Sequence, residues 1–145
     1  MGSPGCGNSD GWVKIEGQWF LFRDDHQVYG DKSWHEAENY CRVRGANLAS
    51  VTSEEMFEEL KKRMKLGELW IGLQDPHRNG SWMWSDGSPF ELEKWFEGEP
   101  SDLGKEYCGE MQKRRSKETG WNNRRCGAEV SWICSRKTCR EFFLS

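Results

Sequence analysis

Long apolar runs are missing from this sequence of 145 residues. Hydrophobic residues make up 35% of it, the mean hydropathy is −0.93, and no stretch reaches about 18 consecutive apolar residues. We therefore expect no membrane-spanning helix in this stretch. Residues 1–5 lack the basic and apolar regions of a signal peptide, so the chain is compatible with a fragment whose membrane anchor, if any, lies elsewhere.

A large excess of charge of one sign is also lacking. The 21 basic and 24 acidic residues leave a net charge of −3. This balance excludes a general electrostatic attraction to nucleic acid or to acidic lipid, so any such binding would have to be local.

Signatures of zinc binding and of catalysis are absent as well. The sequence contains no Cys-x-x-Cys pair, and its three histidines, His26, His35 and His77, are isolated from one another. It has no Ser-His-Asp arrangement and no glycine loop that could cradle a phosphate. We therefore expect a binding module and not an enzyme.

The cysteines indicate an oxidising environment. The six lie at Cys6, Cys41, Cys108, Cys126, Cys134 and Cys139. An even number without metal-binding spacing favours three disulfides and an extracellular protein. The spacing alone leaves the pairing open.

Hydrophobic periodicity predicts one α+β domain without internal repeats. Ser33 and Glu36 have the spacing of a capping box, and the helix that they begin should end at Gly45. Thr52 with Glu55 predicts the start of a second helix. Strands are predicted at 19–22, 69–73, 82–84, 107–111 and 130–134.

Several short motifs occur in a characteristic order. They are Trp70-Ile71-Gly72-Leu73, Trp82-Met83-Trp84, Glu99-Pro100-Ser101, Trp121-Asn122-Asn123 and Trp132-Ile133-Cys134. With the cysteines between them, these motifs resemble the C-type lectin-like domain family over about residues 11–134. The resemblance implies a double-loop fold with two helices, two small antiparallel sheets and a long loop that carries the ligand site.

The resemblance also implies the disulfides and the boundaries of the domain. It pairs Cys41 with Cys134 and Cys108 with Cys126. Cys6 and Cys139 remain and are predicted to pair, as in family members that resemble the low-affinity IgE receptor. We expect an N-terminal lead at 1–10, the lectin-like domain at 11–135 and a C-terminal tail at 136–145.

A calcium site is implied in the long loop. In sugar-binding members of the family, oxygen atoms there hold one calcium ion, and two vicinal sugar hydroxyls complete its coordination. The matching residues here are Glu99, Ser101, Glu106, Asn122 and Asn123, with Pro100 in the cis form. Ser101 replaces an asparagine and Asn123 an aspartate, so we expect weak calcium binding. The Glu-Pro-Ser order implies a preference for mannose, glucose or fucose over galactose.

A second, weaker calcium position maps to Asp75, Asn79 and Asp102, with Glu106 shared. Tyr107 stands where an acidic residue is common in the family. This position is therefore expected to be depleted of ligands as well.

Positive charge is concentrated in residues 102–126, which carry a net charge of +3 while the rest of the chain carries −6. Arg114, Arg115, Arg124 and Arg125 are therefore candidate contacts for a sulfated or sialylated glycan or for an acidic protein face. A solvated loop is the competing interpretation. Likewise, Glu99 and Glu106 are either calcium ligands or loop carboxylates paired with nearby basic residues.

Two functional hypotheses follow. In the first, the chain is an extracellular carbohydrate-recognition domain that uses a weak calcium site to bind a glycan or glycoprotein. In the second, it is a calcium-independent immune-receptor domain that binds a protein or anionic ligand. Both place it in the ectodomain of a type II cell-surface receptor or in a secreted protein. One further motif, Asn79-Gly80-Ser81, fits either an N-glycosylation site or a tight turn.

Overall fold

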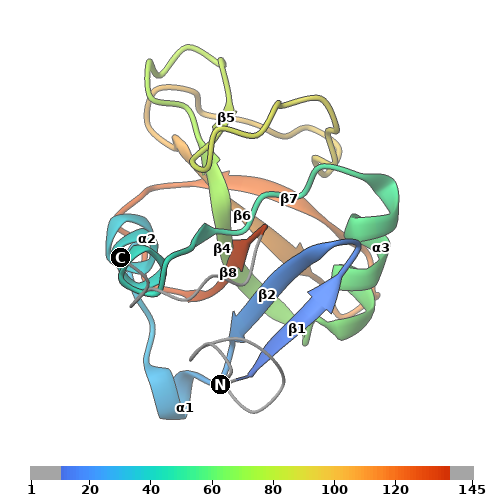
Figure 1. The fold of residues 1–145 in the computed structure, drawn as a ribbon. Coiled ribbons are helices and arrows are strands. Elements are labelled where there is room, and N and C mark those ends of the chain that lie inside the picture. The colour runs from blue at the N-terminus through green and yellow to red at the C-terminus, as the bar shows by residue number, and fades with distance from the viewer. Residues whose placement is uncertain (1–10, 138–145) are drawn as a thin grey trace.

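The computed structural model describes residues 11–137 as one α+β domain (Figure 1). Its helices are α1 (His26–Tyr29), α2 (Trp34–Val43) and α3 (Glu54–Arg63). Its strands are β1 (Trp12–Ile15), β2 (Gln18–Arg23), β3 (Asn47–Leu48), β4 (Gly67–Gln74), β5 (Met83–Trp84), β6 (Cys108–Lys113), β7 (Thr119–Arg124) and β8 (Ser131–Arg136). The two main helices, α2 and α3, lie on opposite flanks of the strands.

The strands form one connected mixed sheet in the order β1-β2-β8-β4-β6-β7. The expected arrangement of two small antiparallel sheets is therefore wrong in its connectivity. The reason is a short parallel contact between β4 and β8, in which Leu69 pairs with Ser131 and Trp70 with Trp132. The other pairings between these strands are antiparallel.

The helix termini follow the capping signals closely. The Ser33–Glu36 capping box of α2 is confirmed, since the Ser33 side chain accepts from the Glu36 amide and the Glu36 carboxylate accepts from the Ser33 amide. Helix α3 begins one residue later than predicted, because Ser53 and not Thr52 is its N-cap. The Ser53 hydroxyl accepts from the Met56 amide 3.1 Å away.

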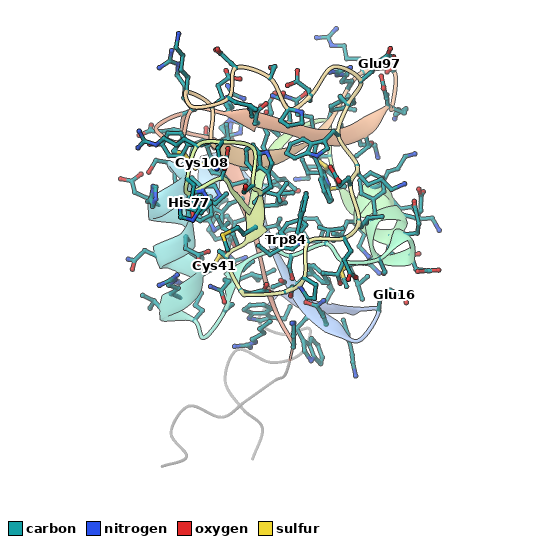
Figure 2. The ribbon with its side chains drawn as sticks, turned by 90° about the horizontal axis from the view of Figure 1, so that it is seen from above. Glu16, Cys41, His77, Trp84, Glu97 and Cys108 are labelled. Carbon is teal, nitrogen blue, oxygen red and sulfur yellow. A yellow bond between two sulfur atoms is a disulfide. The ribbon has the colours of Figure 1, made fainter. Side chains whose placement is uncertain are left out.

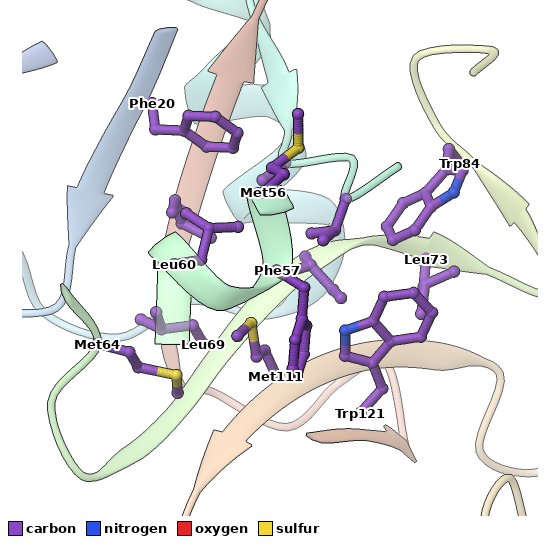
Figure 3. Close-up of a cluster of buried hydrophobic side chains, with 14 of the residues drawn as sticks. Phe20, Met56, Phe57, Leu60, Met64, Leu69, Leu73, Trp84, Met111 and Trp121 are labelled. Carbon is purple, nitrogen blue, oxygen red and sulfur yellow. The ribbon is translucent and has the colours of Figure 1, made fainter. Parts of the chain in front are cut away.

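Two buried clusters form the core. One gathers under α3, where Phe57 and Leu60 pack with Met111 and Trp121 (Figure 3). The other surrounds the disulfide of α2 and contains Trp34, Trp70 and Trp132. In the second cluster, the Trp34 indole donates to the Ile71 carbonyl and the Trp70 indole to the Lys32 carbonyl, each at 2.8 Å. Large aromatic side chains thus supply both the buried area and the polar ties.

The two family disulfides are confirmed. Cys41 of α2 is joined to Cys134 of β8, and Cys108 at the start of β6 is joined to Cys126 just after β7. Their sequence separations are 93 and 18 residues. The predicted third pair, Cys6 with Cys139, lies outside the described residues.

Neither α2 nor α3, nor any other helix between residues 11 and 137, combines the length and the hydrophobicity needed to span a bilayer.

The glycine near the start of β6 provides a test of how tightly the strands pack. A Cβ atom at Gly109 would clash with the Cβ of Leu73 on β4. We expect Gly109→Ala to lower the free energy of unfolding by about 1–3 kcal/mol, as overpacking of a core does. Gly127→Ala is the control, because nothing lies within 4 Å of its Cβ position. Equal urea midpoints for the two variants would show that the contact is not tight.

Candidate ligand-binding loop

The long segment between β5 and β6 forms the irregular lobe of the molecule beside β5 (Figure 1). Its middle is anchored to β7: the Phe96 amide donates to the Trp121 carbonyl, and the Trp121 amide donates to the Lys94 carbonyl. The rings of Trp84 and Trp95 lie 5.3 and 5.9 Å from that of Trp121. Seen from above, Trp84 lies well inside the molecule and Glu97 at its edge (Figure 2). Trp84 and Trp121 therefore belong to the core, and the partly buried Trp95 packs against them.

The Glu99-Pro100-Ser101 motif makes a turn at the surface. The Glu99–Pro100 peptide bond is cis, which confirms that prediction. The Ser101 hydroxyl donates to Glu99 Oε1 at 2.8 Å. The turn thus presents a carboxylate and a hydroxyl side by side.

Asn123 holds this turn to the sheet. Its Oδ1 accepts from the Ser101 amide at 3.0 Å, and its Nδ2 donates to the carbonyl oxygens of Ser101 and Glu106, the latter at 2.7 Å. The side chain is 1% exposed. One amide therefore bridges the two flanks of the loop and uses both of its polar ends. An aspartate could not do this, because it has no N–H group for the two carbonyls.

Three carboxylates gather beside this bridge. The pKa of Glu106 is raised, first by its partial burial and then by the negative charges of Asp102 and Glu99, while Arg125 and Arg124 act in the opposite direction. The Glu106 backbone amide also donates to the Asp102 carbonyl at 3.1 Å. Such repulsion between carboxylates is what a bound cation would relieve.

Asn122 points to a different partner. Its Nδ2 donates to Glu110 Oε2 on β6 at 3.1 Å. Glu110 is fully buried and also accepts from Gln112 at 2.6 Å and from the Arg124 guanidinium at 3.1 Å. Burial raises the pKa of Glu110, although these three donors oppose the shift. Asn122 is therefore part of a buried polar network that the motifs do not predict, although Glu110, an acidic residue between Cys108 and Met111, is a signal for it.

The second calcium position is arranged as a hydrogen-bonded turn. Asp75 is fully buried, and its two carboxylate oxygens accept from the amides of Asn79 and Gly80 at 3.3 and 2.7 Å. Arg78 covers Tyr107: its guanidinium donates to the phenol oxygen at 2.9 Å and lies 4.2 Å from the ring centroid. The Asp75 carboxylate therefore accepts hydrogen bonds from backbone amides. Asp102 contacts Glu106 through the backbone, because its carbonyl accepts from the Glu106 amide.

The four candidate arginines fall into two separate pairs. Arg114 and Arg115 lie in the turn between β6 and β7, whereas Arg124 and Arg125 lie at the far end of β7. Lys113 pairs with Thr119 at one end of the β6–β7 hairpin, and Cys108 pairs with Arg124 at the other end, five residues along the strand. At about 3.4 Å per residue, the two ends are about 17 Å apart. A single small ligand would therefore meet one pair or the other.

The donor set for a metal is incomplete. Across residues 11–137, no three His, Cys, Asp or Glu side chains are arranged to hold a metal ion by themselves. A cation beside Glu99, Asp102 and Glu106 would need further oxygens, such as the Ser101 hydroxyl, backbone carbonyls, water or a ligand. Calcium takes six to eight oxygens and tolerates such mixed sets.

The family is decided by comparison with known proteins. The family model for the lectin C-type domain matches residues 30–136. This chain belongs to the C-type lectin domain family. C-type lectin domains are non-enzymatic, so the expectation of a binding module agrees with the family.

Curated relatives of this C-type lectin domain include members of two C-type lectin domain families. It is 41% identical to rat C-type lectin domain family 4 member F over 130 residues, which are 88% of this chain and 23% of that protein. It is 33% identical to mouse C-type lectin domain family 10 member A, over 90% of this chain and 42% of that one. The chain thus spans about a quarter to two fifths of the length of these curated relatives.

Two solved structures extend the comparison. The trimeric structure of the Kupffer cell C-type lectin receptor Clec4f is 33% identical with a TM-score of 0.75, covering 92% of this chain and 87% of that one. The cow carbohydrate-recognition domain of CD23, solved in the presence of a GlcNAc2Man3 oligosaccharide, is 31% identical with a TM-score of 0.75. It covers 90% of this chain and 95% of that one.

The bridging role of Asn123 can be tested without metal. In buffer with EDTA, we expect Asn123→Asp to lower the free energy of unfolding by about 1–3 kcal/mol, because two buried carbonyls lose their donor. Asn39→Asp makes the same charge change at an exposed position of α2 and should have little effect. If both variants unfold at the same urea concentration as the wild type, Asn123 does not hold the loop.

Proposed function

We propose that this chain is an extracellular carbohydrate-recognition domain of a C-type lectin receptor and that its long loop binds a glycan through a weak calcium site. The observation that carries the proposal is the surface turn in which Glu99 and Ser101 lie side by side, fixed by Asn123 next to Glu106. The cow CD23 domain, of similar fold, was solved in the presence of an oligosaccharide. The two disulfides fit an extracellular setting.

The residues of the turn suit calcium in part. Glu99, Asp102 and Glu106 supply negative charge, and Ser101 supplies a hydroxyl oxygen. Asn123 Oδ1 is already bonded to the Ser101 amide, and the Asn122 amide is bonded to Glu110. The proposed site therefore keeps Glu99 and Glu106 but lacks the aspartate of the full motif at position 123, and both asparagine side chains are already engaged, so calcium should bind with a Kd on the order of 10⁻³ M.

The protein groups have separate parts in the proposed recognition. When bound, calcium would supply direct coordination of two vicinal sugar hydroxyls. The Glu99 carboxylate accepts a hydrogen bond from one sugar hydroxyl, while the Ser101 hydroxyl can donate or accept. Asn123 orients the turn from behind and does not need to touch the sugar. This arrangement is consistent with a preference for mannose, glucose or fucose.

The proposal includes the third disulfide and the boundaries of the domain. The Arg136 guanidinium lies 4.0 Å from the centroid of the Trp12 ring, and Trp19 pairs with Arg136 across β2 and β8. The two ends of the described chain are thus neighbours, which supports the proposed pairing of Cys6 with Cys139. It also supports boundaries near 11 and 135 for the lectin-like domain.

Calcium titration tests the proposed site. We expect calorimetry to give a Kd in the millimolar range for the wild type and no binding heat for Glu99→Gln combined with Glu106→Gln. Binding to a mannose-rich glycan array should disappear in EDTA.

The control for this titration is Glu91→Gln with Glu97→Gln, two exposed loop carboxylates outside the turn. These changes should leave calcium binding as in the wild type. No heat up to several millimolar calcium, together with a blank array, would refute the proposed calcium-dependent lectin.

A calcium-independent function is the second candidate. It is supported by the Asn123 bridge, which fixes the loop without a metal, and by the basic turn between β6 and β7. In that turn the Arg114 guanidinium lies 3.6 Å from the centroid of the Phe96 ring, while Arg115 and Lys117 are exposed. A stacked, oriented guanidinium suits a sulfate or carboxylate ligand.

Charge reversal tests this candidate. Arg114→Glu with Arg115→Glu should weaken binding to a sulfated glycan such as heparin at least tenfold in low salt, because two favourable contacts become repulsive. Lys61→Glu with Lys62→Glu on α3 makes the same change in net charge and serves as the control. If both double variants elute from a heparin column at the same salt concentration, the turn has no specific role in binding.

A further inference from the structure

The loop between β4 and β5 carries the single Asn-x-Ser/Thr triplet of the chain. Among the six asparagines, only Asn79 is followed two positions later by serine or threonine, with Gly80 between them. All three residues of the triplet are exposed. A sequence triplet alone is weak evidence, so its setting in the fold decides what it can do.

The loop is shaped by Asp75 and not by the side-chain nitrogen of Asn79. The buried Asp75 carboxylate accepts from the backbone amides of Asn79 and Gly80. The Asn79 side chain takes part through its oxygen, because Oδ1 accepts from the Ser81 amide at 3.1 Å. Replacing one hydrogen on Nδ2 would therefore leave each of these bonds intact.

We propose that Asn79 is an N-glycosylation site of this chain. In the reaction, Nδ2 loses a proton and forms a bond to the anomeric carbon of an oligosaccharide. The donor is a lipid diphosphate sugar of the secretory pathway, whose anomeric C–O bond breaks as the lipid diphosphate leaves. The transferase and the donor belong to the cell, and this chain supplies the acceptor amide and the Ser81 hydroxyl.

The folded loop has room for the product. Attachment takes place while the chain is still unfolded, so the fold must later accept the glycan at that position. Asn79 meets this condition because it lies at the tip of an exposed turn. The contrasting site is Asn39, in Asn39-Tyr40-Cys41: it lies within α2, and the sulfur at the third position is bonded to Cys134.

The glycan would lie beside the proposed ligand-binding loop. A Cβ atom at Gly80 would be 3.4 Å from Leu103 Cδ1, and one at Gly104 would be 3.8 Å from the Arg78 carbonyl. The two loops are therefore in contact. Leu103 is a large apolar side chain with 48% of its surface exposed, and it lies next to Gly80, the residue that follows the proposed attachment site.

The experiment is expression of the chain through the secretory pathway of cultured animal cells, followed by intact mass spectrometry. We expect the secreted wild type to be heavier than its polypeptide and to lose that excess on treatment with an amidase that removes N-glycans. Ser81→Ala should abolish the excess while keeping the Asn79 turn, since the backbone amide of residue 81 remains. Ser81→Thr should retain it.

Two further variants complete the test. Asn79→Gln should abolish the modification, and Asn39→Gln should leave it as in the wild type. A secreted wild-type chain with the mass of the bare polypeptide would overturn the proposal. So would a wild-type chain that, before amidase treatment, carries only aspartate at position 79, or an excess mass that persists in Ser81→Ala.

Discussion

Strand β8 must pair on both of its edges, and the rest of the domain is arranged around this requirement. It accepts β2 on one side and β4 on the other, and β3 pairs with its end nearest Cys134. The disulfide to Cys41 fixes α2 against it as well. Strand β4 runs parallel to β8, and its C-terminal end lies on the side of the molecule where β5 and the long loop lie.

The alternation of side chains along β7 divides the candidate site in two. Successive residues of a strand face opposite sides of a sheet, and Asn122 and Asn123 are neighbours in β7. Asn122 consequently meets the buried Glu110, while Asn123 meets the carbonyls of the loop. One face of the strand satisfies a buried charge and the other face holds the ligand loop, so the two amides have different physical tasks.

Much of the fold could be predicted from local signals. Capping chemistry located α2, aromatic and apolar runs located the centres of β2, β4 and β8, and the family resemblance gave both described disulfides. The pattern missed α1, which is a single turn capped by Asp25, because four polar or exposed residues have no apolar face to reveal them. It missed β7 because Thr119–Arg124 is polar, and its pairing with β6 is a long-range contact.

The candidate site was predictable in composition but not in its connections. The resemblance named the residues of the turn, and the structure brings Glu99, Ser101, Glu106 and Asn123 together. The resemblance could not predict that Asn123 would bond to the backbone, that Arg78 would stack on Tyr107, or that the four arginines would lie at opposite ends of the β6–β7 hairpin. Those outcomes depend on the strand register and on which backbone groups the fold leaves without a hydrogen-bond partner. A short sequence motif determines neither of them.

The amide of Asn123 carries a consequence for how the loop behaves in different surroundings. A loop that is held together by a bound ion becomes disordered when the ion dissociates. This happens, for example, in a vesicle whose free calcium falls after uptake from the cell surface. In this chain the Asn123 side chain holds the loop together, and it cannot diffuse away as an ion can. The proposed sugar-binding surface would therefore keep its shape as free calcium falls, and only its affinity for a sugar would vary with the ion.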